Sequence, residues 1–493
     1  MWTIVGVDRQ VEPLDLSRSA TNSIRAKTFE SRCCMAFCNR QREISTEDRE
    51  VVERPQSAMK FVLSSYGTRG EIEPMVGIGR ELLRRGHDVQ MVVPPDLVEF
   101  TAAAGLVAFA YRMDSQALIE AYRKYCAYHF ESSWKASREK SREKARLARE
   151  SAVLGAQCEA ETRTTLMALA AEADLLFTGQ NFEHPAADVA ELLGIPLATL
   201  HFTPIRVNGQ VSTFLPPVLT ALPPSLLRAA MSATDWLNWR ATSQAEDAER
   251  RKLGLPKAKG PWSWRIAERG SLEIQAYDDV LFPGLAAEWA RWDDQRPFVG
   301  ALAMELPTDS DEEVLSWIAE GAPPIFFGFG SMPVESAADT VAMIAVACAQ
   351  LGERALICSG SSDFSRGIPH FDHVKVVGAV SYAAIFPACR AIVHHGSTGT
   401  TAAGLRAGMP TLILWLLHDQ RVWATQVKRL KVGTGRHISA TTEKSLTADL
   451  RRILAPQYLA RARAIATRMT KPAESVSDAA DLVEGLARAH RAG

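Results

Sequence analysis

The chain has 493 residues, of which 47% are hydrophobic and 23% charged, and its formal net charge at pH 7 is −1. This length suits two domains of roughly 200 residues each, and a net charge near zero excludes a general electrostatic attraction to nucleic acid. No apolar run approaches the roughly 18 residues that a membrane-spanning helix needs.

Residues 1–58 differ in character from the rest of the chain. They are polar, lack sustained periodicity and carry three of the eight cysteines. They do not begin with a basic stretch followed by an apolar core, as secretory signal peptides do. The other cysteines show neither zinc-site spacing nor a disulfide framework, which favours a reducing compartment. We therefore expect a cytoplasmic protein that starts at Met59, with 1–58 a disordered or wrongly assigned extension.

The first strongly patterned segment is KFVLSSYGTRGEIEPMVGIGRELLRRGHDVQMVVPP, residues 60–95. It predicts a strand at 61–65, a glycine-bracketed loop at 67–70, an amphipathic helix to about residue 85 and a strand at 89–93. This βαβ pattern implies a parallel sheet. A helical stretch is expected over 116–172, and further strands at 175–178 and 197–200.

Within the helical stretch, the segment Lys135–Arg149 holds seven basic residues. One interpretation is a solvated helix face on which Glu139 and Glu143 pair with basic neighbours three or four positions away. The other is a face held against anionic lipid head groups, where each cation contributes on the order of 1 kcal/mol. The second would place the protein at the inner face of the plasma membrane.

A second series of strands and helices follows the acidic, proline-containing stretch LPTDSDEEVLSWIAEGAPP. Strands are predicted at 325–330, 355–359, 374–377, 391–395 and 411–415, and helices at 340–351, 382–386 and 400–407. The fold class is therefore α/β, with two doubly wound Rossmann-like domains at 59–283 and 323–493, a linker at 284–322 and a C-terminal helix. Ligands are expected in the cleft at the carboxyl ends of the strands. Asp309 and Asp311 are expected to cap a helix rather than bind a metal.

The stretch AIVHHGSTGTTAAGLRAGMP, residues 391–410, joins a strand to a helix through a glycine-rich turn. Glycines let a ligand approach the backbone, and the free N–H groups of a helix start attract anions. We expect a phosphate here, with His394 or His395 donating a hydrogen bond to it. Adjacent strand residues point to opposite faces, so the two histidines are not expected to share a metal ion.

Four motifs occur in the order seen in GT-B glycosyltransferases: GTRGEIEP at 67–74, FGFGSM at 327–332, HHGSTGTTAAGLRAGMP at 394–410 and DQ at 419–420. They resemble most closely the family 1 branch that includes sterol and glycopeptide-antibiotic glycosyltransferases. The stretches RKLGLPKAKGP, RIAERGSLEIQAYDDVLFPGLAAEW and RPFVGAL are similar, more narrowly, to mycobacterial glycosyltransferases that decorate glycopeptidolipids. The resemblance covers Met59 to Ala487.

The resemblance implies how the chain binds a nucleotide-sugar donor. His394, with His395 as second choice, would contact the diphosphate together with Ser331. Asp419 and Gln420 would hold the sugar, and Val380 to Tyr382 would pack against the nucleobase. The turn that cradles the phosphates would consist of Gly396, Ser397, Thr398, Gly399 and Thr400.

The resemblance also implies an inverting, metal-independent transfer that uses no cofactor beyond the donor and needs a base at the acceptor. Glu71, where relatives have an aspartate, is our predicted base; otherwise it is a helix-terminal carboxylate that stabilises the dipole. Arg69 would orient Glu71 or bind the donor. His201 and Phe202, after a strand end, are predicted to bind the acceptor.

The predicted function is the transfer of a hexose or deoxyhexose from a UDP- or dTDP-sugar to a hydroxyl of a lipophilic acceptor. A dTDP-deoxysugar such as rhamnose and a (glyco)peptidolipid are expected if the narrower resemblance holds. Glu71, Thr398 and His418 depart from the family pattern, so an inactive GT-B nucleotide-sugar-binding protein stays open. A sterol or small-lipid glucosyltransferase and a nucleotide-sugar epimerase stay open as well. The tryptophans at 236, 239, 262 and 264 are expected to pack in the core or between domains, or else to form an apolar acceptor wall.

Overall fold

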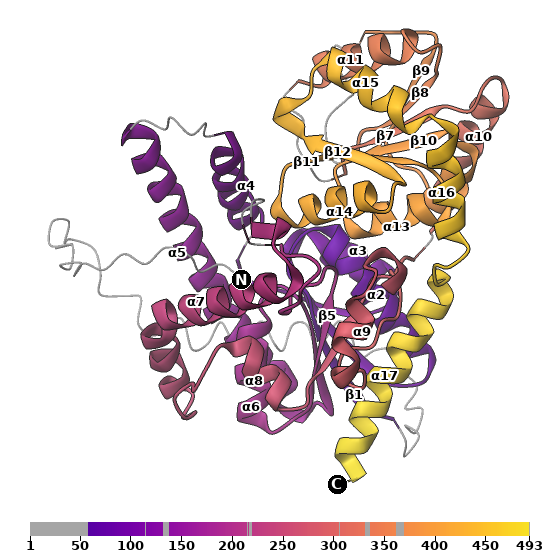
Figure 1. Cartoon of the computed structure of the whole chain (residues 1–493). Coiled ribbons are helices and arrows are strands. Elements are labelled where there is room, and N and C mark those ends of the chain that lie inside the picture. Colours follow the sequence, from indigo (N-terminus) through magenta and orange to yellow (C-terminus); the bar gives the residue numbers. More distant parts are fainter. Residues whose placement is uncertain are drawn as a thin grey trace, which may run out of the picture. The chain divides into compact units, whose positions relative to one another are not determined.

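Two six-stranded sheets organise the computed structural model (Figure 1). It describes residues 58–113, 115–131, 138–213, 215, 219–304, 306–330, 336–360 and 369–492. The strand order is β3-β2-β1-β4-β5-β6 in the first sheet and β12-β11-β10-β7-β8-β9 in the second, and every neighbouring pair is parallel. Counted from its own first strand, each sheet follows the doubly wound order 3-2-1-4-5-6, so the predicted fold class is confirmed.

The strands match the predicted positions within a few residues wherever the sequence is strongly apolar. Three strands, β3, β6 and β12, are additional to those predicted. The strands are β1 (Lys60–Ser64), β2 (Asp88–Val93), β3 (Val107–Ala110), β4 (Leu175–Gly179), β5 (Leu197–His201), β6 (Leu272–Gln275), β7 (Ile325–Gly328), β8 (Ala355–Cys358), β9 (Val374–Val377), β10 (Ala391–His394), β11 (Thr411–Trp415) and β12 (Gly433–His437).

The helices connect and cover these strands. The single helical stretch expected over 116–172 is two helices, α4 and α5, packed against each other. The helices are α2 (Arg69–Arg84), α3 (Val98–Ala103), α4 (Ser115–Glu131), α5 (Arg138–Leu169), α6 (Glu183–Leu193), α7 (Pro224–Lys252), α8 (Trp262–Glu268), α9 (Leu285–Trp289), α10 (Asp311–Ala319), α11 (Ala337–Ala349), α12 (Tyr382–Ile385), α13 (Thr398–Arg406), α14 (His418–Arg429), α15 (Glu443–Ile453), α16 (Pro456–Ala466) and α17 (Pro472–Ala492).

Both faces of each sheet are buried, which explains why the strands read as continuous apolar runs. In the first sheet, Phe61 and Phe177 pack with α2, α3 and α17, whereas Val62 and Leu176 on the other face pack with α4, α5, α6 and α8. In the second sheet, α11 and α15 cover one face, and α10, α12, α13, α14 and α16 cover the other. The carboxyl ends of the strands are left for ligands.

The last helix, α17, packs with the first sheet, although its place in the sequence predicts that it belongs to the second domain. Its Ala479, Val483 and Ala487 belong to the same apolar cluster as β1 and α2. Arg85 at the end of α2 donates to Asp481 at 2.5 Å and to Glu484 at 2.9 Å. The chain therefore crosses back to the first domain after α16, and Met59–Gly493 forms one compact unit. Among the described residues, none of the helices has the length and apolar content that would let it span a membrane.

Candidate active site

The predicted phosphate turn lies between β10 and α13. Gly396 has φ of +101°, and a Cβ there would lie 2.7 Å from the Ile413 side chain and 3.1 Å from Gln420, so only glycine fits the turn. Ser397 is the N-cap residue of α13, and its hydroxyl donates to Thr400 Oγ1 at 2.9 Å. The start of the helix presents free backbone N–H groups, as an anion site requires.

His394 presents an unused N–H donor beside this turn. Its Nδ1 accepts a hydrogen bond from Gly396 N at 3.0 Å, so the ring proton of the neutral imidazole is on Nε2. Nε2 is buried and has no partner among the described residues. Burial, and to a smaller extent the neighbouring His395, holds the pKa of His394 well below its usual value. The residue is thus a neutral donor with a free N–H, as a phosphate contact needs.

His395 differs from His394 in its available nitrogen. Its ring packs against Gly330, at the end of the strand motif that contains the predicted Ser331, which itself lies outside the described residues. Burial lowers the pKa of His395 to about 4, against the opposing effect of a hydrogen bond to the Gly328 backbone. Its Nδ1 is the buried nitrogen without a partner among the described residues, so the bond to Gly328 uses Nε2. The free Nδ1 of the neutral ring then lacks a proton and cannot donate to a phosphate.

Asp419 and Gln420 form the first turn of α14. Gln420 Oε1 accepts from Leu416 N at 2.8 Å and Leu417 N at 3.0 Å, so its carbonyl caps the helix, and no bond of its amide NH₂ to a described residue is found. Burial raises the pKa of Asp419, opposed by the backbone N–H groups of Asp419 and Gln420. His418 Nδ1 lies 3.3 Å from the Tyr122 hydroxyl of α4, so the residue before Asp419 contacts the first domain.

The predicted nucleobase loop at Val380–Tyr382 is held by an aspartate from the linker. Asp311 Oδ1 accepts from Ser381 N at 2.8 Å and from Thr308 Oγ1 at 2.7 Å. Asp311 lies at the start of α10, as expected, and it also fixes the Val380–Tyr382 loop. Burial raises the pKa of Tyr382, and among the smaller effects Glu73 raises it and Arg69 lowers it. The loop therefore lies near the start of α2.

Glu71 occupies the third position of α2 and caps the helix start. Its Oε2 accepts from Thr68 N and from Thr68 Oγ1, both at 2.7 Å, and the bond from Thr68 N is the Glu71 half of a capping box. Burial raises the pKa of Glu71; the hydrogen bonds from Thr68 oppose this shift, and the negative charge of Asp419 adds to it. The structure therefore contains the predicted helix-terminal carboxylate, and the charge of Asp419, predicted to hold the sugar, acts on it.

Arg69 does not orient Glu71, which was one of its two predicted roles. Its Nε donates to Glu73 Oε2 at 2.9 Å, and its guanidinium lies 4.6 Å from the centre of the Phe100 ring. The side chain is 59% exposed. Arg69 thus stays a candidate only for the donor.

The predicted acceptor residue His201 is part of the core. It is fully buried, its Nε2 contacts Glu183 and Thr199, and Gln275 on β6 lies 3.2 Å from its Nδ1. Burial alone would raise the pKa of Glu183, but Arg206 and His201 outweigh it and lower the pKa to about 2. The prediction that His201 contacts the acceptor is wrong, because its ring is used inside this network.

Phe202 contributes its backbone to a contact between the domains. Its N–H donates to Gln180 Oε1 at 2.9 Å, and its carbonyl accepts from Thr398 Oγ1 at 3.0 Å. The same hydroxyl of Thr398 accepts from Trp423 Nε1 at 3.0 Å. Thr398, predicted to cradle a phosphate, therefore uses its side chain to join the start of α13 to the first domain.

The replacement Thr398→Val tests this contact. It keeps the shape but leaves the Phe202 carbonyl and the Trp423 indole without their shared partner, which costs about 1–3 kcal/mol for a buried polar group. We expect the apparent melting temperature to fall by a few degrees. Thr425→Val, which removes only a hydroxyl bonded to the preceding turn of α14, is the matched control. An equal melting temperature for the two variants would contradict the assignment.

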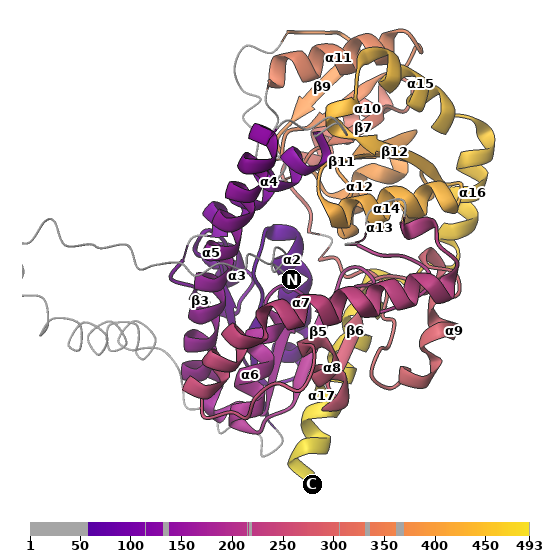
Figure 2. The ribbon, with the colours of Figure 1, turned by 60° about the vertical axis from the view of Figure 1, so that its left-hand side comes forward.

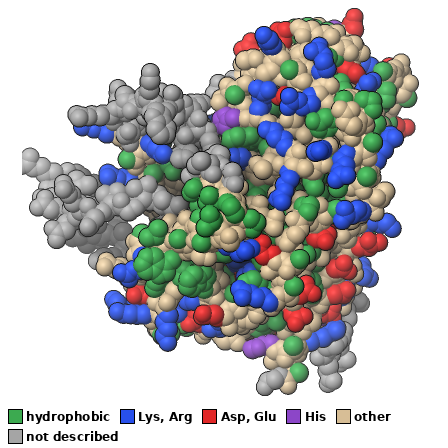
Figure 3. Space-filling view, in the orientation of Figure 1, with side chains coloured by type: hydrophobic (Ala, Val, Ile, Leu, Met, Phe, Trp, Pro, Cys, Tyr) green, Lys and Arg blue, Asp and Glu red, His purple; other side chains and the backbone are tan. Residues whose placement is uncertain are grey.

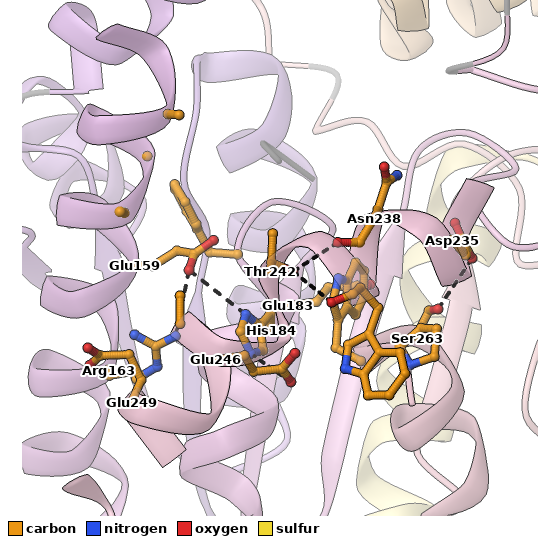
Figure 4. A pocket seen from close by; sticks show the side chains of 18 of the residues that line it. Glu159, Arg163, Glu183, His184, Asp235, Asn238, Thr242, Glu246, Glu249 and Ser263 are labelled. Carbon is orange, nitrogen blue, oxygen red and sulfur yellow. Dashed lines mark hydrogen bonds and ion pairs between the residues drawn. The ribbon is translucent and has the colours of Figure 1, made fainter. Parts of the chain in front are cut away.

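A cavity of about 500 Å³ lies between α5 and α7 (Figure 4; the helices can be followed in Figures 1 and 2). Gln180 and Phe182, after β4, and Ile205 and Arg206, after β5, contribute to its walls, so it opens at the carboxyl edge of the first sheet. It is linked to the predicted phosphate turn through Phe202, whose N–H donates to Gln180 Oε1 and whose carbonyl accepts from Thr398 Oγ1. In the sequence, this cavity was indicated by the segment after β5, which mixes aromatic, polar and proline residues.

The cavity combines apolar walls with carboxyl groups. Trp239 and Trp262 line it, together with small side chains of α5 such as Ala156 and Ala160. Asp235 is hydrogen-bonded by Ser263 Oγ at 3.4 Å, and burial raises its pKa, opposed by Arg206. Of the four tryptophans expected in the core, Trp236 and Trp264 are instead 45% and 40% exposed. The expectation of core packing is therefore wrong for these two.

The comparisons with known proteins agree with this geometry. Residues 359–484 match the family described as Erythromycin biosynthesis protein CIII-like, C-terminal domain. An uncharacterized glycosyltransferase of Mycobacterium tuberculosis is 57% identical over 434 residues, which are 88% of this chain and 100% of that protein. A sterol 3-beta-glucosyltransferase of Arabidopsis thaliana is 26% identical over 81% of this chain and 63% of its own length.

Solved structures with low sequence identity share the fold. The glycotransferase of kitacinnamycin has a TM-score of 0.60 at 17% identity and covers 87% of this chain and 99% of its own. The spinosyn rhamnosyltransferase SpnG, solved with thymidine diphosphate, has a TM-score of 0.55 at 15% identity and covers 85% of this chain and 100% of its own. The fold and the site define a GT-B glycosyltransferase. The chain belongs to the same family as the mycobacterial glycosyltransferase that is 57% identical to it.

Proposed function

We propose that this glycosyltransferase moves a hexose or deoxyhexose from a nucleotide sugar to a hydroxyl of a lipophilic acceptor, with inversion and without a metal ion. The acceptor is a (glyco)peptidolipid and the donor a dTDP- or UDP-sugar. The observation that carries the proposal is the position of Glu71: it lies close enough to Asp419 for that negative charge to raise the pKa of Glu71. The proposed base and the residue proposed to hold the sugar are thus near enough for their charges to interact.

The proposed reaction forms one bond and breaks another at the anomeric carbon. The acceptor oxygen attacks from the side opposite the nucleotide, its proton passes to the Glu71 carboxylate, and the bond to the diphosphate oxygen breaks. The negative charge that develops on the leaving diphosphate is stabilised by the Nε2–H of His394 and the start of α13. Asp419 and the amide of Gln420 position the sugar hydroxyls.

The proposed acceptor site is the cavity between α5 and α7. Its tryptophan and alanine walls suit an apolar chain, and its carboxyl groups and Asn238 suit amide or hydroxyl groups, a combination that a peptidolipid offers. The proposal of a thymidine nucleotide is supported by the spinosyn rhamnosyltransferase, which was solved with thymidine diphosphate. The sterol 3-beta-glucosyltransferase supports a lipid acceptor more generally.

The basic segment Lys135–Arg149 stays a predicted contact with anionic lipid. Part of it lies outside the described residues. Within the described part, Arg146 pairs with Glu143 at 2.6 Å and lies 3.7 Å from Glu150, which supports the interpretation of a solvated, self-paired face. Vesicle co-sedimentation of a variant with its lysines and arginines changed to glutamine tests the lipid contact.

A donor panel tests the proposed function. The purified protein is incubated with UDP-glucose, dTDP-glucose and dTDP-rhamnose, with and without a peptidolipid extract or a sterol, and nucleotide release and glycosylated product are measured. We expect release that depends on the peptidolipid. Transfer to the sterol alone would replace the proposed acceptor class. Nucleotide binding without release from any donor would favour an inactive protein, and a changed sugar without transfer would indicate an epimerase.

A further inference from the structure

The outer side of α7 carries apolar side chains that solvent can reach. Leu226, Trp236 and Leu237 are 54%, 45% and 59% exposed, and Ala229 and Ala233 between them are exposed as well. Leu226, Ala229 and Ala233 are three or four positions apart, and Trp236 and Leu237 follow Ala233 by three and four positions, so the five share one side of the helix; we call this side the α7 outer face. Figure 3 shows hydrophobic side chains gathered over α7.

Packing among the described residues leaves the α7 outer face exposed. The opposite side of the same helix, with Asn238, Trp239 and Thr242, lines the cavity between α5 and α7. A helix that covers a protein with one side normally exposes polar residues on the other. A contiguous row of exposed leucine and tryptophan therefore indicates a surface that contacts something else.

Most of the exposed charges around the α7 outer face are basic, although Asp247 and Glu249 lie in the last turns of the helix. Arg240 is exposed next to it, with its guanidinium 5.9 Å from the centre of the Trp236 ring. Asp235 is the only carboxylate between residues 222 and 244, and it lines the cavity on the opposite side. Exposed basic residues follow at the end of the helix and in the next loop: Arg251, Lys252, Lys257 and Lys259, of which Lys252 pairs with Glu249 at 2.6 Å.

We propose that the α7 outer face rests on the surface of a lipid bilayer that contains anionic head groups. Trp236 and Leu237 enter the interfacial layer, where an indole ring with one polar edge is well accommodated. Arg240 and the basic end of α7 lie over the anionic head groups. This contact is separate from the predicted one through Lys135–Arg149, and it does not depend on which acceptor the enzyme uses.

The charge pattern favours a bilayer over a second copy of the chain. A symmetric dimer through this face would place the same surface on both sides of the interface. The exposed Arg251, Lys252, Lys257 and Lys259 outnumber Asp247 and Glu249 at this end of α7, so a dimer would bring together net positive charge from both partners, and like charges oppose association. An anionic bilayer supplies the sign complementary to this net positive charge.

The experiment measures co-sedimentation of the full chain with vesicles of phosphatidylcholine alone and of phosphatidylcholine with phosphatidylglycerol. The test variant is Trp236→Gln with Leu237→Gln. The matched control is Leu315→Gln with Val346→Gln, two hydrophobic residues of the second domain that are 38% and 39% exposed. We expect the test variant to lose about tenfold or more in partition to the mixed vesicles, because two large apolar side chains no longer enter the lipid. The control is expected to bind like the unchanged protein.

The dependence on salt and on vesicle composition, light scattering and melting curves test the proposal further. Salt is expected to weaken binding, and vesicles of phosphatidylcholine alone are expected to bind less, because anionic head groups contribute. Equal binding of the test and control variants, or no binding of the unchanged protein to mixed vesicles, would overturn the proposal. A dimer of the unchanged protein that the test variant converts to a monomer, measured by light scattering, would assign the face to self-association instead. Melting curves for both variants exclude a folding defect.

Discussion

Replacing Glu71 with glutamine is expected to lower kcat for glycosyl transfer by roughly 10²–10⁴-fold, the usual contribution of a general base. Glutamine retains a carbonyl oxygen that can accept from Thr68 N and Thr68 Oγ1, both at 2.7 Å from the present carboxylate, so the capping of α2 is kept. Nucleotide binding is expected to stay unchanged. Steady-state kinetics with the donor found in the panel, together with titration of the nucleotide, measures both effects.

The matched control for this prediction is Glu73→Gln. Glu73 lies on the same turn of α2, but its carboxylate pairs with Arg69 on the surface, so its loss is expected to change kcat little. If the two variants lose activity equally, Glu71 acts through local structure and is not the base. An unchanged rate for Glu71→Gln would contradict the proposed role directly.

The pH dependence of the reaction provides a second test of Glu71. Burial and Asp419 raise the pKa of Glu71, and the base acts only when its carboxylate is ionised. The rate is therefore expected to fall on the acidic side at a higher pH than an ordinary glutamate would give. Glu71→Gln should remove this acidic limb of the kcat profile. A limb that persists in the variant would have to belong to another group.

Replacing His394 with alanine is expected to weaken the transition state for donor cleavage by about 1.5–3 kcal/mol, the range for a hydrogen bond to a charged group. This corresponds to roughly a 10- to 150-fold loss in kcat/KM for the donor. The reason is the unpartnered Nε2–H, which is the donor left over after Nδ1 accepts from Gly396 N. The comparison His395→Ala is expected to lose less activity, because the free nitrogen of His395 carries no proton.

The ring protonation of the two histidines can be observed without activity. Nitrogen NMR at neutral pH is expected to show both rings neutral, with the proton of His394 on Nε2, because burial lowers both pKa values. Addition of a nucleoside diphosphate should shift the Nε2 signal of His394. If the signal of His395 moves instead and His395→Ala is the weaker enzyme, the order of the two residues is reversed.

Much of the fold follows from local sequence because both sheets are parallel and buried on both faces. Strands such as β1 and β11 read as continuous apolar runs, and helix starts such as that of α13 follow glycine turns. The strand β12 was missed because its sequence, GTGRH, has no apolar run. Its glycines are required by neighbours: a Cβ on Gly435 would lie 2.8 Å from both the Ala424 side chain and the Ile413 carbonyl. That requirement exists only once α14 and β11 are in place.

The phosphate turn could also be predicted, since a strand, a glycine turn and a helix start are consecutive in the chain. The error at His201 has a definite cause. His201 was predicted to bind the acceptor because it follows the end of a strand, whereas β6, which was not predicted, pairs His201 with Gln275 and encloses the ring. Because β6 was not predicted, the core residue His201 was assigned to the acceptor site.

The fold class and the glycosyltransferase family could be predicted from the sequence, because each depends on patterns and motifs of residues that are close in the chain. Which groups of the predicted site remain available follows only from the tertiary contacts. Thr398 is used by Phe202 and Trp423, Arg69 by Glu73, and the Nε2–H of His394 by no described residue. The tertiary structure also decided that Trp236 points to solvent. Partners of this kind come from elements far apart in the sequence, so periodicity and spacing carry no information about them.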